Sequence, residues 1–377
     1  MTKEHHTPAR GNRRTFLKTI GAAALATGMP RPTPVGAAAN VRFGADMYSL
    51  AAQSWTPFQM LDWAATMKVT VVHFSEIRFL GSPDWQIALA PDNLRKIRAR
   101  ADELHIDLEI GMRSICPSSG DFNKALGTAD ELIARMLAAA ALVKSPIVRC
   151  VLGTQADRRT GIERHIAETV QVLKANRSRI MDAGVKMAIE NHAGDMQARE
   201  LKGLIEAAGP EYVGVCLDSG NPVWTIEDPH LTLETLAPYV LTSHMRDSYL
   251  FNSSRGIAVQ WTRMGEGNMG MEDYLRTYVQ KCPGKPVSLE VIVTPNFRIF
   301  NHRDPQAWEI FKTTPAWEFA RFLALADRGV PKPLPEPGQG RGAGQGRGAQ
   351  PSEEACRRNL EDVEASVKWA QAFLATV

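Results

Sequence analysis

Short apolar and β-branched runs recur along most of the chain, and the segments between them repeat their apolar residues with the period of a helix. The runs lie near residues 41–48, 69–76, 106–112, 146–152, 185–190, 213–218, 240–244 and 286–291. Eight units of a buried run followed by a helical segment predict an α/β fold, the closed (β/α)8 TIM barrel. An open doubly wound sheet is the alternative, but no Gly-rich phosphate loop follows the first run, as dinucleotide binders of that fold require.

The pattern changes sharply after Gly329, so we assign the barrel to residues 40–330. Residues 331–350 are rich in Pro and then in Gly, cannot bury apolar surface, and predict a linker. An RNA-binding Gly/Arg tract is the alternative, but two arginines without an aromatic residue favour a plain linker.

Residues 351–377 predict one further helix at the C-terminus, with an apolar stripe along one face. The stripe consists of Leu360, Val363, Val367, Ala370 and Leu374. We expect this extra C-terminal helix to pack on the barrel; a contact between the subunits of a homo-oligomer is the alternative use of the stripe.

The first 39 residues resemble a twin-arginine signal peptide, because Arg13-Arg14 with Phe16-Leu17-Lys18 precedes a weakly apolar stretch and Ala37-Ala38-Ala39. The apolar stretch, from Ile20 to Met29, is too short for a bilayer span, which needs about 20 residues. We therefore expect export to the periplasm without stable membrane insertion; a membrane anchor, or an ordinary basic start of the chain, is the alternative.

The charge of the chain gives no support to a nucleic-acid partner. The whole sequence carries 44 basic and 41 acidic residues, a net charge of +3. Residues 1–39 hold six Lys or Arg and one Glu, so the remaining part is close to −2. The five cysteines are odd in number, widely spaced and without a C-x-x-C pair, so a disulfide framework is not indicated; Cys150 and Cys216 lie in strand-like runs, which predicts buried, inert thiols.

Four of the predicted strands in the second half of the chain end in a side chain that can bind a metal. These residues are Glu190, Asp218, His244 and Glu290, separated by 28, 26 and 46 residues that we expect to hold one helical segment each. Because the carboxyl ends of barrel strands face one mouth, three carboxylates and one imidazole should meet there. That donor set suits Mn²⁺, Co²⁺, Zn²⁺ or Mg²⁺, whereas unrelated salt bridges or caps are the alternative.

The four strand ends, together with Asp-Ser-Gly-Asn at 218–221 and Met-Gly-Glu-Gly at 264–267, resemble the xylose isomerase-like TIM-barrel superfamily, and within it the sugar phosphate isomerase/epimerase family. The resemblance covers residues 41–325. It implies one divalent cation, commonly Mn²⁺, held by Glu190, Asp218, His244 and Glu290, with Glu190 and Glu290 as the acid/base pair. The apurinic endonuclease branch needs several further histidines that this chain lacks, so DNA repair is disfavoured.

Seven further residues are candidates for contacts with the substrate: His192, Asn221, Arg246, Glu76, Arg113, Trp224 and Trp261. The alternatives are a loop hydrogen bond for His192, a salt bridge near Asp247 for Arg246, and mutual pairing of Glu76 with Arg113. We place the two tryptophans on loops at the open face, and packing under a loop is their alternative. Asn221 stands where many epimerases of the family have a histidine, and an amide cannot titrate near neutral pH.

The chemistry of such a centre is proton transfer next to a carbonyl. A cation that chelates a carbonyl and the neighbouring hydroxyl stabilises an enediolate, and a carboxylate on each side can move the proton. Since phosphorylated sugars are scarce outside the cytoplasm, the sequence predicts an exported isomerase or epimerase for an unphosphorylated carbohydrate, a sugar or glycoside. A lyase or dehydratase that eliminates a β-substituent from a keto-sugar, keto-glycoside or keto-inositol is the first alternative. A non-catalytic carbohydrate-binding barrel is the second.

Overall fold

The computed structural model describes residues 41–334 and 351–377, so the predicted signal peptide and most of the predicted linker lie outside the described part. Eight parallel strands form one sheet in the order β10-β1-β2-β3-β4-β5-β6-β7. The strands are β1 (Phe43–Asp46), β2 (Val71–Phe74), β3 (Asp107–Ser114), β4 (Ile147–Val151), β5 (Lys186–Glu190), β6 (Val213–Asp218), β7 (Val240–His244) and β10 (Val287–Leu289).

The sheet closes on itself next to β7. Met245, just after β7, pairs in parallel with Leu289 of β10, and its backbone N–H donates to the carbonyl of Ser288 at 2.7 Å. The carbonyl of Met245 then accepts from the N–H of Glu290 at 3.1 Å. The predicted (β/α)8 TIM barrel is therefore confirmed, and each of the eight predicted runs overlaps one of its strands.

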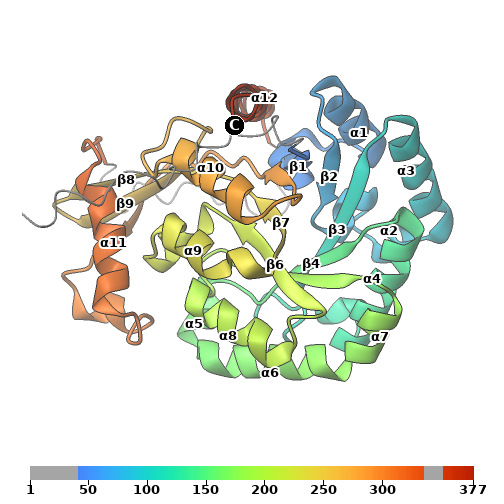
Figure 1. Cartoon of the computed structure of the whole chain (residues 1–377), viewed down its shortest axis with the longest axis horizontal. Coiled ribbons are helices and arrows are strands. Elements are labelled where there is room, and N and C mark those ends of the chain that lie inside the picture. The colour runs from blue at the N-terminus through green and yellow to red at the C-terminus, as the bar shows by residue number, and fades with distance from the viewer. Residues whose placement is uncertain (1–40, 335–350) are drawn as a thin grey trace, which may run out of the picture. The chain divides into compact units, whose positions relative to one another are not determined.

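The helices lie around the strands (Figure 1). They are α1 (Pro57–Thr66), α2 (Trp85–Ala88), α3 (Pro91–Glu103), α4 (Ala129–Val143), α5 (Gln155–Arg159), α6 (Ile162–Ala175), α7 (Arg177–Asp182), α8 (Ala198–Ala208), α9 (Pro229–Leu236), α10 (Met271–Lys281), α11 (Ala316–Asp327) and α12 (Glu353–Leu374). Local sequence sets their starts: the Thr128 hydroxyl accepts from the Glu131 N–H, and the Glu131 carboxylate accepts from the Thr128 N–H, which is a capping box. Both faces of the strands are buried, as expected where helices cover a parallel sheet.

Short 3₁₀ helices complete the connections. They are η2 (Met47–Gln53), η3 (Ile77–Leu80), η4 (Lys124–Leu126), η5 (Asn221–Thr225), η6 (Ala237–Tyr239) and η7 (Pro305–Trp308). Three of them follow barrel strands closely: η2 continues from β1, and η3 and η5 begin three residues after β2 and β6.

The chain between β7 and β10 contains more than the single helical segment that we expected. The strands β8 (Asp247–Ser253) and β9 (Gly256–Thr262) form an antiparallel hairpin before α10, and β11 (Arg298–Phe300) adds a third strand to β9. Gly256 at the turn has φ +121°, and a Cβ there would lie 2.3 Å from the carbonyl oxygen of Phe300. This small sheet and α11 share a second apolar cluster, and Figure 1 shows them together at the left.

The C-terminal helix α12 packs against the barrel domain at η2. The amide of Gln53 donates to the carbonyl of Cys356 at 2.7 Å, while Val363 and Val367 are buried in the main apolar cluster. The same helix supports the loop before α10, because the Ser366 hydroxyl accepts from the backbone N–H of Met264. Within residues 41–334 and 351–377, no helix has both the length and the hydropathy needed to cross a membrane.

Candidate metal centre

The four strand-end residues lie together at one end of the barrel. Glu190, Asp218 and His244 are the last residues of β5, β6 and β7, and Glu290 directly follows β10. One ligand atom from each of the four lies within 4.8 Å of the others. Glu190, Asp218 and His244 are fully buried, and Glu290 is 4% exposed. The structure thus brings together the whole set that the strand-end pattern selected.

The ring of His244 offers a nitrogen that fits a cation. Its Nδ1 is buried without a hydrogen-bond partner among the residues that the structure describes, 3.0 Å from Glu190 Oε2 and 3.1 Å from Glu290 Oε2. Ligand atoms about 2.1 Å from a six-coordinate cation are about 3.0 Å from their neighbours, by octahedral geometry. Burial opposes a charge on His244, but its neighbours, Cys216 and Glu190 first, raise the pKa of the ring well above the usual range, so Nδ1 takes a proton or, in its place, a divalent cation.

Two buried arginines enter the same cluster. The Arg149 guanidinium, on β4, donates to Glu190 through Nε at 2.6 Å and Nη2 at 2.5 Å. Arg246, two residues after β7, donates from Nε to Asp218 at 2.8 Å and from Nη2 to Glu290 at 2.5 Å. Each carboxylate of the cluster therefore has a permanent positive charge next to it. We had placed Arg246 near the substrate but had not singled out Arg149.

The three carboxylates of the cluster differ: burial raises the pKa of Asp218 to about 7 in spite of Arg246, whereas the pKa values of the two glutamates are lowered. Burial opposes the charge on Glu190, but Arg149 and His244 hold its pKa well below the usual range of a glutamate. Burial also opposes the charge on Glu290, yet Arg246 and His244 lower the pKa of that carboxyl to about 2. Both glutamates are therefore carboxylates at neutral pH and can accept a proton.

A second layer of polar residues lies beneath the centre. His73 Nδ1, on β2, is 2.9 Å from His244 Nε2, and Asp46 Oδ2, at the end of β1, is 3.9 Å from the same nitrogen. Burial raises the pKa of Asp46 to about 6 and lowers the pKa of His73 well below the usual range. His73 orients the ring of His244, whereas neither carboxylate oxygen of Asp46 has a hydrogen-bond partner among the described residues. Asp46 ends its strand just as the four ligands do, so the strand-end rule could have found it.

Asn221 reaches the centre, whereas His192 is held by the backbone. The Asn221 amide donates to Glu190 Oε1 at 3.3 Å, and its backbone N–H donates to Asp218 at 2.7 Å. His192 Nδ1 lies 2.7 Å from the carbonyl oxygen of Gly153. The loop-stabilising alternative therefore describes His192, and Asn221 remains at the cluster.

Glu76 and Arg113, two predicted substrate contacts, pair with each other. Arg113 Nη1 donates to Glu76 at 2.7 Å, and its Nε donates to Asp121 at 2.9 Å. Arg78 donates to the second oxygen of Glu76 at 2.5 Å. Burial works against ionisation of Glu76, but Arg78 and Arg113 lower its pKa overall. Both residues are therefore satisfied within an ion-pair network.

The two tryptophans stack on one another. Their ring centroids are 4.0 Å apart with an interplanar angle of 2°. Arg298 lies over the outer face of Trp224, at 4.5 Å, and Arg246 over Trp261, at 4.3 Å. The expected loop position of Trp261 is wrong. This residue belongs to β9, a strand of the inserted hairpin, and is 5% exposed. The stack supports Arg246 from behind, and neither indole face is open to a sugar.

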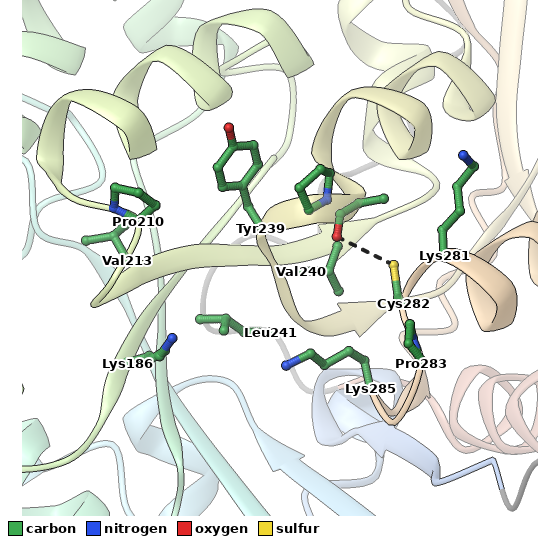
Figure 2. A pocket seen from close by; sticks show the side chains of 12 residues that line it. Lys186, Pro210, Val213, Tyr239, Val240, Leu241, Lys281, Cys282, Pro283 and Lys285 are labelled. Carbon is green, nitrogen blue, oxygen red and sulfur yellow. Dashed lines mark hydrogen bonds between the residues drawn. The ribbon is translucent and has the colours of Figure 1, made fainter.

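A separate cavity of about 400 Å³ lies at the other end of the strands. Lys186, Val213 and Val240 line it, and they are the first residues of β5, β6 and β7. Figure 2 shows the side chains of Lys281 and Lys285 beside it. Because the metal ligands end the same strands, this cavity does not belong to the candidate centre.

Comparison with known proteins supports the same assignment of fold. Residues 61–308 match the model of the family described as xylose isomerase-like TIM barrel. The chain is 26% identical over 160 residues to the 3-oxo-isoapionate decarboxylase of Pectobacterium atrosepticum, a match that covers 42% of this chain and 51% of that protein. The chain thus spans about half the length of this curated relative.

Three solved structures share the fold at low sequence identity. D-psicose 3-epimerase in the presence of D-fructose has a TM-score of 0.51 and 16% identity, over 75% of this chain and 97% of that one. The probable 3-DHS dehydratase AsbF of Bacillus anthracis has a TM-score of 0.51 and 12% identity, over 76% and 99%. A Mycobacterium smegmatis protein described as xylose isomerase-like TIM barrel, in complex with magnesium, has a TM-score of 0.53 and 11% identity, over 69% and 92%.

Proposed function

Because the chain belongs to the xylose isomerase-like TIM-barrel family, we propose that it is a divalent-metal-dependent isomerase or epimerase acting on an unphosphorylated sugar or glycoside. The observation that carries this proposal is the approach of Glu190 and Glu290 to the same nitrogen of His244, at 3.0 and 3.1 Å. Two carboxylates beside one point can take a proton from one carbon and return a proton to the same or a neighbouring carbon.

The donor set defines the cation. Glu190, Asp218, His244 and Glu290 would hold it, and a divalent ion bound there polarises a carbonyl and its neighbouring hydroxyl as a Lewis acid. We propose Mn²⁺, because three carboxylates and one imidazole suit it and because a protein that folds before export can be loaded where copper and zinc are scarce.

The remaining side chains have distinct tasks in this proposal. Glu290 takes the proton next to the carbonyl, and Arg246, 2.5 Å away, stabilises the negative charge that develops on the substrate oxygen. Arg149 keeps Glu190 ionised, so Glu190 serves as the second proton acceptor. The amide of Asn221 orients a substrate hydroxyl next to Glu190.

Isotope exchange tests the proposal directly. The purified chain, loaded with Mn²⁺, is incubated in D₂O with a panel of aldoses, ketoses and glycosides, and deuterium at the carbon next to the carbonyl is followed by NMR. We expect exchange with at least one sugar, and its loss in Glu290→Gln. Glu227→Gln is the matched control, because Glu227 is a buried carboxylate outside the cluster. If no sugar exchanges, the proposal is refuted.

A lyase is the second candidate, favoured by the match to a decarboxylase and by the two arginines in the centre. The same enediolate expels a β-substituent when the substrate carries one, and a β-keto acid that loses carbon dioxide leaves an enolate that the same centre would stabilise. Mass spectrometry of the products separates the two reactions: an isomerase leaves the mass unchanged, whereas a lyase yields fragments, water or carbon dioxide.

The export part of the proposal rests on Arg13-Arg14 and the residues that follow them. Replacement of both by lysine should retain the protein in the cytoplasm, while replacement of Arg31, another arginine of the first 39 residues, should not. Fractionation of cells that express the full chain measures this, and unchanged export of the double variant would refute the twin-arginine route.

A further inference from the structure

A second cluster of metal-binding side chains lies apart from the centre described above. Cys116 follows β3 by two residues, and His165 and Glu168 lie one turn apart on α6. One ligand atom from each of the three lies within 4.8 Å of the others. Cys116 and His165 are fully buried, while Glu168 is half-buried. The cluster shares no residue with the four ligands of the main centre.

The distances within this cluster match those around a tetrahedral cation. Cys116 Sγ is 3.2 Å from Glu168 Oε2 and 3.7 Å from His165 Nδ1. Neighbouring ligands of tetrahedral Zn²⁺ are about 3.3–3.7 Å apart when the bonds are about 2.0–2.3 Å long. A thiolate, an imidazole and a carboxylate are also three of the ligand types that Zn²⁺ takes in proteins.

The hydrogen bonds of Thr160 indicate which ring nitrogen of His165 carries the proton and which presents a lone pair to the cluster. The Thr160 hydroxyl donates to the carbonyl of Asp157 at 2.9 Å, so it accepts from His165 Nε2 at 2.8 Å. Nε2 therefore carries the proton, and in the neutral ring Nδ1 presents its lone pair to Cys116 and Glu168. A metal-binding histidine is usually held in this way by a partner on its other nitrogen.

The hydroxyl of Ser118 has one proton but contacts two possible acceptors in the cluster. Ser118 Oγ lies 2.7 Å from His165 Nδ1 and also makes a close contact with Glu168 Oε2. When Nδ1 carries no proton, the one hydroxyl proton of Ser118 cannot serve both acceptors, and one of these contacts joins two lone pairs until Nδ1 takes a proton or a cation. A cation removes this conflict, because it binds the ring nitrogen and the carboxylate together.

We propose that Cys116, His165 and Glu168 form a second metal site that takes Zn²⁺, with the Ser118 hydroxyl or a water in the fourth position. Binding converts the Cys116 thiol to a thiolate, and its proton is released to the solvent. The ion links the loop after β3 to α6. This inference does not depend on the proposed isomerase chemistry.

Cobalt spectroscopy tests the site on the full chain. The protein is stripped with a chelator and titrated with Co²⁺, whose thiolate complexes give a charge-transfer band in the near ultraviolet. We expect this band, and its loss in Cys116→Ser. Cys216→Ser is the matched control, because Cys216 lies beside His244 of the main centre. A band that disappears in Cys216→Ser but persists in Cys116→Ser overturns the proposal, as does the absence of any band.

A second measurement covers the case in which Cys116→Ser fails to fold. Thr160→Val keeps the size of the side chain and removes the hydrogen bond to His165, and we expect Zn²⁺ affinity at the site to fall about 10- to 100-fold. Unchanged affinity in Thr160→Val shows a hydrogen-bonded network without a metal.

Discussion

Arg149→Met should make the stability of the barrel depend on the cation. In the structure, Arg149 is 4% exposed and donates to the fully buried Glu190 at 2.6 Å, while its Nη1 donates to the carbonyl of Met112 at 3.3 Å. Methionine keeps much of the length of the side chain and removes its charge. Removing one partner of a buried ion pair costs about 3–5 kcal/mol, because the other charge is left uncompensated.

A bound cation should offset much of that loss. If Glu190 is a ligand, the cation supplies the positive charge that Arg149 provided, and the variant should bind the cation more tightly than the parent. Because the cation also stabilises the parent, the loss at saturation shrinks by about 1.4 kcal/mol for each tenfold by which the variant binds the cation more tightly. We therefore expect the full loss in a chelator and a clearly smaller loss in excess Mn²⁺ or Mg²⁺.

The loss should also depend on pH. Because the pKa of Glu190 is lowered in the folded parent, its contribution to stability is present above the usual glutamate pKa and is lost as the pH falls through the lowered value. In Arg149→Met the pKa of Glu190 rises, since burial is then opposed mainly by His244. Protonation relieves the buried charge, so the difference between variant and parent should shrink from pH 8 to pH 5.

Urea unfolding followed by circular dichroism measures these effects, with and without the cation. Arg158→Met is the matched control, because Arg158 is also buried and pairs with Glu200 at 2.7 Å, outside the centre. The control should lose stability equally with and without the cation. If Arg149→Met does the same, Glu190 does not bind the cation and the reasoning fails.

Three further predictions concern other parts of the molecule. Burial raises the pKa of Glu227 to about 7, so the free energy of unfolding should fall by on the order of 3 kcal/mol as the pH rises from 4.5 to 7. Urea titrations at pH 5 and 8 measure this fall, which should be smaller in Glu227→Gln. Trp261→Ala removes the stacking partner of Trp224 and should cost about 3–5 kcal/mol in urea unfolding, whereas Trp261→Phe should cost less. Val367→Asp on α12 should cost about 3 kcal/mol or more by the same assay, while the exposed Lys368→Asp should change stability by less than about 1 kcal/mol.

The barrel and the convergence of the four strand-end residues could be predicted because both follow from local patterns. A short apolar run between polar turns marks a strand, and parallel strands in a barrel have a common carboxyl end. The residue at that end, such as Glu190 or Asp218, is then assigned to the mouth without knowledge of any distance. The same rule applied to the first strand would have included Asp46.

Other features depend on contacts that a local pattern does not encode. Arg149 stands in the apolar run Ile-Val-Arg-Cys-Val, and which way a strand residue points follows from a register that the sequence leaves open. The hairpin of β8 and β9 turns at Ser254-Arg255, without the Asn-Gly or Asp-Gly signal that marks tight turns. Cys116 and His165 are 49 residues apart and lack the spacing of a sequence motif, so only the fold brings them together.

The presence of Arg149 and Arg246 inside the carboxylate cluster has a consequence for how the protein acquires its ion. The two guanidinium groups neutralise the carboxylates, so the barrel can fold before the cation binds. Cation binding is then a reversible step that follows folding and is not required for it. We therefore expect one preparation to be emptied, refilled and compared across several divalent ions without refolding.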